Sequence, residues 1–370
     1  MMDCLNHSDL DMDDWGELLL QPLHGQRFPL AAEFEITERC NLGCVHCFIN
    51  QPAGSSASIQ REMSTDQVRQ VLDQIAEAGC LHLLLTGGEP LLRPDFAEIY
   101  LYARQKGMLV MLFTNATMMS PAVIETLKQM PPILVEVSVY GATKETYEAV
   151  TRVPGSWERF TNGLKLLQES GLPLALKSVV LSKNKSDLPA IKKMAQDMGV
   201  NFRYDGSVFP RLDGSDAPYW DRLDIEEMLA LDREDPERMH AWTLQYELSQ
   251  KLGLRSEKYV YSCGAGKRSF HIDCQGRLAM CMMARTPSYN ILELGFPRAW
   301  EELGKETQLE RTLQVPCLDC GASGICIQCP GWSQLVYGDN ESVVGFICKL
   351  NKAREHEICY NKKVIEEHIL

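Results

Sequence analysis

An alternation that begins near residue 31 constrains the fold of this chain more than any other feature. Short apolar runs alternate with segments whose apolar residues recur at helical spacing, which is typical of βα units around a parallel sheet. The six runs are AAEFEIT, LHLLLT, LVMLFTN, ILVEVSV, LALKSVV and NFRYDG. A closed (β/α)8 barrel needs eight units, so we expect an α/β fold with either a partial barrel or an open doubly wound sheet.

The segments between these runs predict helices at residues 96–105, 122–129, 157–169 and 188–198, and a further helix that begins after Ser64. Ser64 and Gln67 stand in the positions of a capping box. After residue 206 the alternation fades; residues 213–219 resemble a loop and residues 225–231 a short helix. The remainder is rich in cysteine and short of long periodic segments, so we expect metal to organise it.

Composition narrows the class of protein. A net charge of -13 argues against nucleic acid as a partner, because phosphate binding needs clustered Lys and Arg. No apolar stretch approaches the ~20 residues that span a bilayer, and the acidic start MMDCLNHSDLDMDD lacks the features of a signal peptide. We therefore expect a cytoplasmic protein with neither nucleic-acid nor membrane partners.

The carboxyl ends of parallel strands meet at one edge of a sheet, and chemistry belongs there. Three cysteines follow the first predicted strand, and the segment GGEP follows the second. Thr114 and Asn115 close the third strand, and Ser138 lies near the end of the fourth. These residues should share one rim.

The chain contains 14 cysteines, a high number for a compartment that keeps thiols reduced, so we expect metal or sulfide ligands rather than disulfides. Cys40, Cys44 and Cys47 have the spacing CxxxCxxC. Three thiolates at this spacing can bind three irons of a cubane cluster and leave the fourth iron open. A three-thiolate zinc site or redox-active cysteines are the alternatives.

The residues around this motif, TERCNLGCVHC, are followed by TGGEP, TNAT and SVYGAT, and together they resemble the radical S-adenosylmethionine (SAM) superfamily. The resemblance covers about residues 31–206. It implies a partial (β/α)6 barrel in which Cys40, Cys44 and Cys47 hold a [4Fe-4S] cluster. It also implies reductive cleavage of SAM to methionine and a 5'-deoxyadenosyl radical, which abstracts hydrogen from a substrate carbon.

The resemblance further implies the residues that bind SAM. The family's GGEP segment holds the amino group, and Glu89 is suited to accept a charge-assisted hydrogen bond from it. The implied contacts are Gly87, Gly88 and Glu89 to the amino group, Ser138 to the ribose, Arg152 to the methionine carboxylate and His46 near the adenine.

A second cysteine pattern lies in the last third of the chain. Cys263 is followed by twelve residues, Gly276, four residues and Cys281, and then by a closely spaced group of cysteines. The pattern resembles the SPASM domain, which binds two auxiliary [4Fe-4S] clusters, over about residues 259–350. The resemblance implies Cys263, Cys281 and Cys329 as ligands of the inner cluster, and Cys317, Cys320, Cys326 and Cys348 as ligands of the outer one.

Two points qualify this second resemblance. Only Ile327 and Gln328 separate Cys326 from Cys329, where the family has three residues, and zinc is the alternative for paired CxxC motifs. The inner cluster has three clear ligands, and Cys274 is the nearby candidate for the fourth. Cys274 falls at the tip of a predicted hairpin, out of reach of the other ligands, so we predict an open iron.

These motifs divide the chain into an N-terminal extension (1–30), the barrel (31–206), a linker (207–258), the auxiliary-cluster domain (259–350) and a tail (351–370). His82 and His271 fall inside predicted strands, where we expect core histidines with satisfied hydrogen bonds. Cys4, Cys80 and Cys359 lack partners at metal spacing.

Enzymes with both domains mostly modify peptides, so we expect a radical SAM oxidoreductase that cross-links a ribosomally made precursor peptide. The short segment before residue 31 leaves no room for a leader-recognition domain, and we expect a separate protein or the barrel surface to take that role. A flavodoxin or ferredoxin would supply electrons. The alternatives are a formylglycine-forming sulfatase maturase, disfavoured by Met282 where that family has Asp, a small-molecule dehydrogenase, or a non-catalytic electron carrier.

Overall fold

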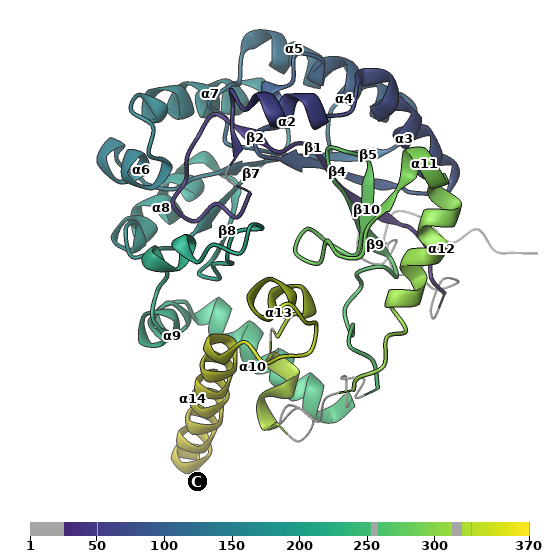
Figure 1. Ribbon diagram of the computed structural model, residues 1–370. Helices are drawn as coiled ribbons and strands as arrows, with labels where there is room; N and C mark the ends of the chain where they lie inside the picture. Colours follow the sequence, from purple (N-terminus) through teal and green to yellow (C-terminus); the bar gives the residue numbers. More distant parts are fainter. Residues whose placement is uncertain (1–25, 50, 253–257, 313–319, 327, 370) are drawn as a thin grey trace, which may run out of the picture.

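The computed structural model describes residues 26–49, 51–252, 258–312, 320–326 and 328–369. Its main feature is a curved sheet in which six parallel strands stand side by side in their order along the chain (Figure 1). This order has no reversal, which excludes the doubly wound alternative and confirms the partial barrel. The strands are β1 (Ala31–Thr37), β4 (His82–Gly87), β5 (Leu109–Thr114), β6 (Leu134–Ser138), β7 (Leu174–Val179) and β8 (Asn201–Asp205).

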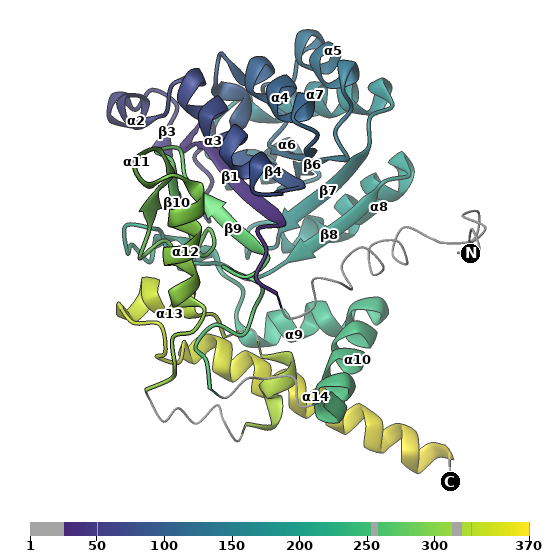
Figure 2. The ribbon, with the colours of Figure 1, turned by 90° about the vertical axis from the view of Figure 1, so that its right-hand side faces the viewer.

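Helices cover the outer side of this sheet. The predicted capping box is present, since Ser64 Oγ accepts from the Gln67 backbone N–H and Gln67 accepts from the Ser64 backbone N–H. Behind this cap, Val68, Val71 and Leu72 are completely buried against the strands. The helices on the outer side are α3 (Thr65–Glu77), α4 (Phe96–Gln105), α5 (Pro121–Gln129), α6 (Lys144–Thr151), α7 (Ser156–Ser170) and α8 (Leu188–Met198). The short helix α2 (Ser56–Arg61) lies beyond the ends of the strands, beside the short strand that precedes it (Figure 2).

The strand register brings the expected residues to one rim. Thr37 of β1 stands opposite Gly87 of β4, Thr114 of β5 opposite Val137 of β6, and Ser138 opposite Lys177 of β7. The cysteine loop leaves β1 at this rim and contains the short strand β2 (Arg39–Cys40), which pairs with β3 (Gln51–Pro52).

A second strand group extends the sheet beyond β1. β9 (Ser269–Ile272) pairs with β1 in parallel, and β10 (Arg277–Ala279) and β11 (Tyr289–Asn290) continue it in antiparallel fashion. The helices α11 (Ile291–Leu294) and α12 (Phe296–Glu306) cover this part. Phe270 and Phe296 belong to the same apolar core as Phe34 of β1. The residues from about 260 to 303 therefore pack as a continuation of the barrel.

The rest of the described chain forms a helical group beside the open edge of the sheet (Figure 2). α9 (Ile225–Arg233), α10 (Pro236–Leu252) and α14 (Gly345–Ile369) contact one another, and α10 and α14 also contact the turn Gly321–Ile325. α13 (Pro330–Tyr337) lies between this group and the strands. Within the described residues, no helix combines the length and the apolar content that crossing a bilayer requires.

Two helices of this group correct the expectation of a region without long elements, because α10 has 17 residues and α14 has 25. The buried side of α14 explains why its pattern is weak. Asn351 and Arg354 are buried there between Ile347 and Ile358. Arg354 Nε donates to Asp232 Oδ2 at 2.7 Å, so the buried stripe is half polar and lacks a clear apolar period.

Candidate active site

The cysteine loop after β1 is fixed against the end of α6. The backbone N–H of Gly43 donates to Thr151 O at 2.9 Å, and that of Val45 donates to Val150 O at 3.0 Å. The Cys40 sulfur accepts from the Leu42 backbone at 3.4 Å and from Asn115 Nδ2 at 3.7 Å. A loop held in this way presents its sulfur atoms in a fixed arrangement.

Cys40, Cys44 and Cys47 lie close enough to influence one another's protonation. Burial raises the pKa of Cys40 to about 12, with a further contribution from the Glu89 carboxylate. Burial also raises the pKa of Cys44, and the neighbouring thiols Cys47 and Cys40 raise it further. A bound metal reverses this effect, because it favours the thiolate. This donor set therefore fits an iron-sulfur cluster.

The glycines of the GGEP segment are required by the packing of the protein backbone. A Cβ atom on Gly87 would lie 2.0 Å from Thr37 O, and one on Gly88 would lie 2.2 Å from Arg39 O. Gly88 and Glu89 donate their backbone N–H groups to these same two carbonyls at 2.8 Å. The two glycines thus let the end of β4 touch the base of the cysteine loop, and both also line the cavity described below.

Glu89 is completely buried and joins the end of β4 to the end of β5. Its carboxylate accepts from Thr114 Oγ1 at 2.8 Å, from the Asn115 backbone at 2.7 Å and from the Leu91 backbone at 3.1 Å. Burial nevertheless raises its pKa to about 7. Burial therefore disfavours the ionised form of this carboxyl group, and an adjacent ammonium group would favour it.

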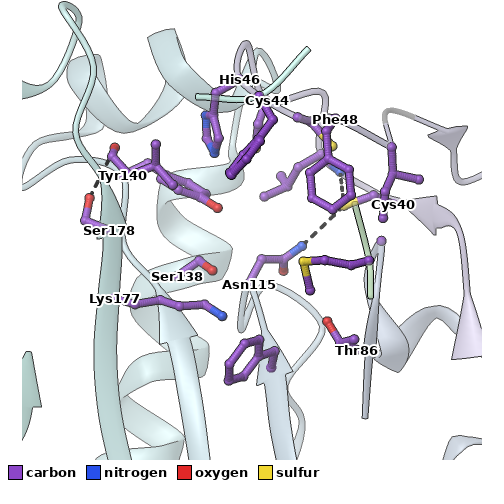
Figure 3. Close-up of a pocket in the computed structure, with 18 of the residues that line it drawn as sticks. Cys40, Cys44, His46, Phe48, Thr86, Asn115, Ser138, Tyr140, Lys177 and Ser178 are labelled. Atoms are coloured by element: carbon purple, nitrogen blue, oxygen red, sulfur yellow. Dashed lines mark hydrogen bonds between the residues drawn. The ribbon is translucent and has the colours of Figure 1, made fainter. Parts of the chain in front are cut away.

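A cavity of about 400 Å³ opens at this rim. Figure 3 shows Asn115, Ser138 and Lys177 pointing into the same space as the cysteine loop. The cavity is lined from every strand of the barrel and from the C-terminal region, including Cys40, Cys44, Cys47, Gly87, Gly88, Asn115, Ser138, Tyr140, Lys177, Asp205, His271 and Met282.

His46 and Tyr140 form an aromatic part of this wall. Their ring centroids are 4.7 Å apart in an edge-on arrangement. His46 is half-buried, and its Nδ1 atom is buried with no hydrogen-bond partner among the described residues. Burial lowers the pKa of His46 to about 4, so the imidazole is neutral near pH 7. An aromatic ring with a buried, unpaired nitrogen beside a group of thiols fits the heterocycle of a bound nucleoside.

The structure does not bring Arg152 into the cavity. Arg152 is the C-cap of α6, with a left-handed φ of 59°, and its side chain is exposed. A Cβ added to Gly43 would lie 3.9 Å from the Cβ of Arg152, so the base of the Arg152 side chain is close to the cysteine loop. Its predicted contact with a carboxylate requires the side chain to turn inward.

Sequence reasoning missed the charged group on the opposite wall. Lys177 Nζ lies 3.2 Å from Glu136 Oε2 and 2.9 Å from the centre of the Phe113 ring. Arg203 donates twice to the same Glu136 carboxylate at 2.6 Å. Burial lowers the pKa of Lys177 to about 7, while the Glu136 charge opposes that shift. The sequence contained one signal of this buried charge, because Lys177 interrupts the apolar run LALKSVV.

Three cysteines of the C-terminal region gather around Tyr261. Burial raises the pKa of this tyrosine, and the thiols of Cys281, Cys329 and Cys263 raise it further. Burial also raises the pKa of Cys281 to about 11, with a further contribution from Cys329. These are the three residues predicted for the inner auxiliary cluster, and that ligand role stays a prediction.

The cysteines predicted for the outer cluster flank the turn Gly321–Ile325. Cys320 precedes it, Cys326 follows it, and Cys348 lies in the first turn of α14. The Cys326 sulfur accepts from Asn351 Nδ2 at 3.5 Å. Cys317 lies outside the described residues, so the predicted set of four stays a prediction.

Cys274 lies in a different environment, at the turn after β9. Its sulfur and one carboxylate oxygen each of Glu35 and Glu38 lie within 4.8 Å of one another. Burial raises the pKa of Cys274, and the charges of Glu35, Glu38, Asp273 and Glu62 raise it further. The neighbours that shift its pKa are thus carboxylates.

Comparisons with known proteins agree with this geometry. Residues 34–195 match the Radical SAM superfamily. The AdoMet-dependent heme synthase of Methanosarcina barkeri is 26% identical over 84% of this chain and 94% of its own length. The mycofactocin maturase MftC of Mycobacterium ulcerans is 29% identical over 84% of this chain and 83% of its own length. A crystal structure of Streptococcus suis SuiB bound to precursor peptide SuiA superposes with a TM-score of 0.68 at 16% identity, covering 95% of this chain and 84% of SuiB.

The fold and the rim cysteines define an enzyme that uses SAM and an iron-sulfur cluster. Residues 34–195 carry a radical SAM domain, and the relatives that match over most of the chain support an enzyme with radical SAM chemistry. The family implies SAM and one [4Fe-4S] cluster as cofactors. Three facing thiols and an unpaired ring nitrogen at the same cavity fit these two groups.

Proposed function

We propose that this enzyme oxidatively modifies a peptide, and that its substrate is a ribosomally made precursor in which it forms a cross-link. The volume of the cavity carries this proposal. Small-ligand sites occupy about 300–1,000 Å³, and this cavity of about 400 Å³ must hold SAM as well as the substrate. The remaining space suits one side chain of a peptide whose other residues lie outside.

The relatives support a peptide substrate. MftC is called a mycofactocin maturase, and SuiB was crystallised with a precursor peptide. Both comparisons extend over most of this chain, beyond the radical SAM domain. The peptide interpretation therefore rests on similarity along the whole described barrel and the C-terminal region.

We assign the SAM-binding cluster to Cys40, Cys44 and Cys47. When bound, the cluster and SAM supply the radical that abstracts hydrogen from the substrate. The chain's own residues hold SAM and keep water out, and we assign this role to Gly87, Gly88, Glu89, Ser138, His46 and Arg152. Glu89 acts by favouring an ammonium near the end of β4, since its charge is buried and costly without one.

We also propose two auxiliary [4Fe-4S] clusters, three clusters in all. Cys263, Cys281 and Cys329 would hold the inner one with an open iron, and Cys317, Cys320, Cys326 and Cys348 the outer one. They would accept the electron that leaves the substrate when its radical is oxidised. This assignment places the auxiliary clusters in residues 259–350, which follow the linker 207–258; the first part of this region, about 260–303, also continues the sheet and core of the barrel (31–206).

Met282 argues against a formylglycine-forming maturase. It lines the cavity directly after Cys281, where that family has an aspartate. A thioether cannot accept the proton that a carboxylate base would take. A non-catalytic electron carrier is also disfavoured, because it has no need of a cavity for SAM beside its cluster.

A tetrapyrrole is the second candidate substrate, because the heme synthase matches along 94% of its own length. A macrocycle with several carboxylates would need more space and unpaired cations. The cations Lys177 and Arg203 are already paired with Glu136. These features favour the peptide.

Reconstituted enzyme tests the two substrates directly. Reduced enzyme and SAM are incubated anaerobically with synthetic peptides encoded beside the gene, and in parallel with iron coproporphyrin III. We expect one peptide to stimulate deoxyadenosine formation and to lose about two hydrogens in mass, as one two-electron oxidation requires. Stimulation by the porphyrin alone contradicts the proposal, and an aldehyde at Cys or Ser identifies a maturase. A flavodoxin or ferredoxin and a separate leader-binding protein are the further partners we propose, in a cytoplasmic setting.

A further inference from the structure

His271 is a buried residue that the assignments above leave without a role. It lies on β9, and 1% of its surface is exposed. It lines the main cavity and an adjoining cavity of about 170 Å³. Neither ring nitrogen has a hydrogen-bond partner among the described residues. The expectation of a satisfied core histidine is therefore wrong at this position.

The surroundings keep this imidazole neutral. Nε2 lies 4.0 Å from Glu35 Oε2, beyond hydrogen-bond distance. Glu35 is instead bound by Arg285, whose two terminal nitrogens donate to it at 2.7 and 3.3 Å. Burial lowers the pKa of His271 well below its ordinary value, and the Arg285 charge adds to that shift. A neutral imidazole offers one donor and one acceptor, and both are free here.

The position of His271 separates it from Ser138, the proposed ribose contact. β1, β4 and β5 lie between β9 and β6, which ends at Ser138. Its neighbour in register on β1 is Glu33, whose Oε2 also lacks a partner among the described residues. Unpaired polar atoms thus lie together on β9 and β1, apart from the ribose contact proposed for Ser138.

An unpaired buried polar group lowers stability unless something binds it. We propose that His271 is a substrate-binding residue whose ring nitrogens hydrogen-bond an amide group of the peptide beside the reacting residue. An amide matches the ring because it also has one donor and one acceptor. A carboxylate matches poorly, since it only accepts and would lie beside Glu35. This inference rests on the proposed function and specifies how the peptide is held.

Stability provides the first test and needs no substrate. His271→Phe removes both polar atoms at similar volume, and His271→Gln keeps a donor and an acceptor. We expect the reconstituted His271→Phe enzyme to melt about 2 °C or more above the wild type, because the unpaired group is gone. His82→Phe, a half-buried histidine of β4 away from this cavity, is the matched control and should not gain stability. Melting of His271→Phe several degrees below the wild type would show a structural hydrogen bond and overturn the inference.

Substrate response provides the second test. The probes are the synthetic peptides encoded beside the gene, and the measured quantity is the ratio of SAM cleavage with peptide to cleavage without it. We expect His271→Phe to lower this ratio about tenfold, as the loss of a buried hydrogen bond does, and His271→Gln to restore part of it. An undiminished ratio in His271→Phe, or equal loss in both variants, overturns the inference.

The two proposals fail in different ways. A wild-type enzyme that responds to iron coproporphyrin III and to no peptide contradicts the peptide function and, with it, the amide contact. A wild-type enzyme that responds to a peptide while His271→Phe responds equally contradicts the role of His271 alone. If the wild type responds to neither probe, the melting temperatures of His271→Phe and the wild type decide whether His271 is unpaired in the free enzyme.

Discussion

The barrel and the helical group that includes residues 320–360 are held together in different ways. In the barrel, a continuous apolar core runs from Phe34 through Leu72 and Leu112 to Val137, all completely buried. In the helical group, the buried apolar residues of this stretch are divided among small clusters. Two are centred on Ile325 and Trp332, and Leu350 belongs to a third with residues of α8 and α9. Five cysteines lie in the described part of this stretch: Cys320, Cys326, Cys329, Cys348 and Cys359.

This difference indicates two relations between metal and fold. The barrel buries enough apolar surface to fold without a cluster, so metal binding by its cysteine loop is not needed for the fold. The small clusters around Ile325 and Trp332 bury much less, so metal binding there should contribute to folding itself. Five predictions, made with four variants, test this contrast in order of decreasing effect.

The largest effect should follow from replacing Cys40, Cys44 and Cys47 together with Ala. We expect deoxyadenosine formation to disappear and iron to fall by about a third from roughly twelve per chain, the content of three cubane clusters. Circular dichroism should show the barrel still folded, because its core is independent of the loop. Cys359→Ser is the control and should keep its iron. Cleavage of SAM by the triple variant would refute the assigned site.

Replacement of Cys320, Cys326 and Cys348 with Ala should instead loosen the fold. We expect a loss of about four irons. Amide hydrogen exchange in residues 345–360 should become at least about tenfold faster, since metal binding there is folding energy. Amides of β4 and β5 should keep their protection. Equal loss of protection in both regions would show that the contrast between them is false.

Glu89→Gln tests the polar end of β4 within the barrel. We expect the affinity for SAM to fall about tenfold, because the amide cannot provide the charge that favours an ammonium. The cluster absorption spectrum should remain. Equilibrium binding of SAM by the anaerobic enzyme measures this, and unchanged affinity would put the role of Glu89 in doubt.

The stability difference between the wild type and Glu89→Gln should depend on pH. Burial raises the Glu89 pKa from an ordinary 4.5 to about 7, so the folded state binds this proton more tightly than the unfolded state. Its contribution to stability is complete below pH 4.5 and is lost as the pH rises through 7. The free energy of unfolding of the wild type minus that of Glu89→Gln should therefore fall across this window in urea titrations. A constant difference would contradict the buried carboxylate.

Cys274→Ser should have the smallest effect. The sulfur lies beside Glu35 and Glu38 and is not proposed as a cluster ligand. We expect iron content and turnover close to those of the wild type. A loss of about four irons would identify Cys274 as the fourth ligand of the inner cluster and remove the open iron from the proposal.

Much of the barrel follows from local patterns in the sequence. The expected helices at residues 96–105 and 188–198 match α4 and α8, because each combines an apolar stripe with a local boundary signal. The capping box of α3 depends on two residues three positions apart. The rim cysteines and the GGEP segment were predictable for the same reason, since strand ends place them together.

The remaining features depend on contacts between distant residues. Nothing near residue 270 indicates that β9 lies parallel to β1, some 240 residues earlier, or that this pairing turns His271 into a wall of the cavity. The long helix α14 was missed because its buried side holds Arg354, which becomes acceptable only when Asp232 of α9 meets it. A sequence can reveal which groups prefer burial or a turn. Whether a buried polar group finds its partner is decided by tertiary structure, because that partner comes from another part of the chain.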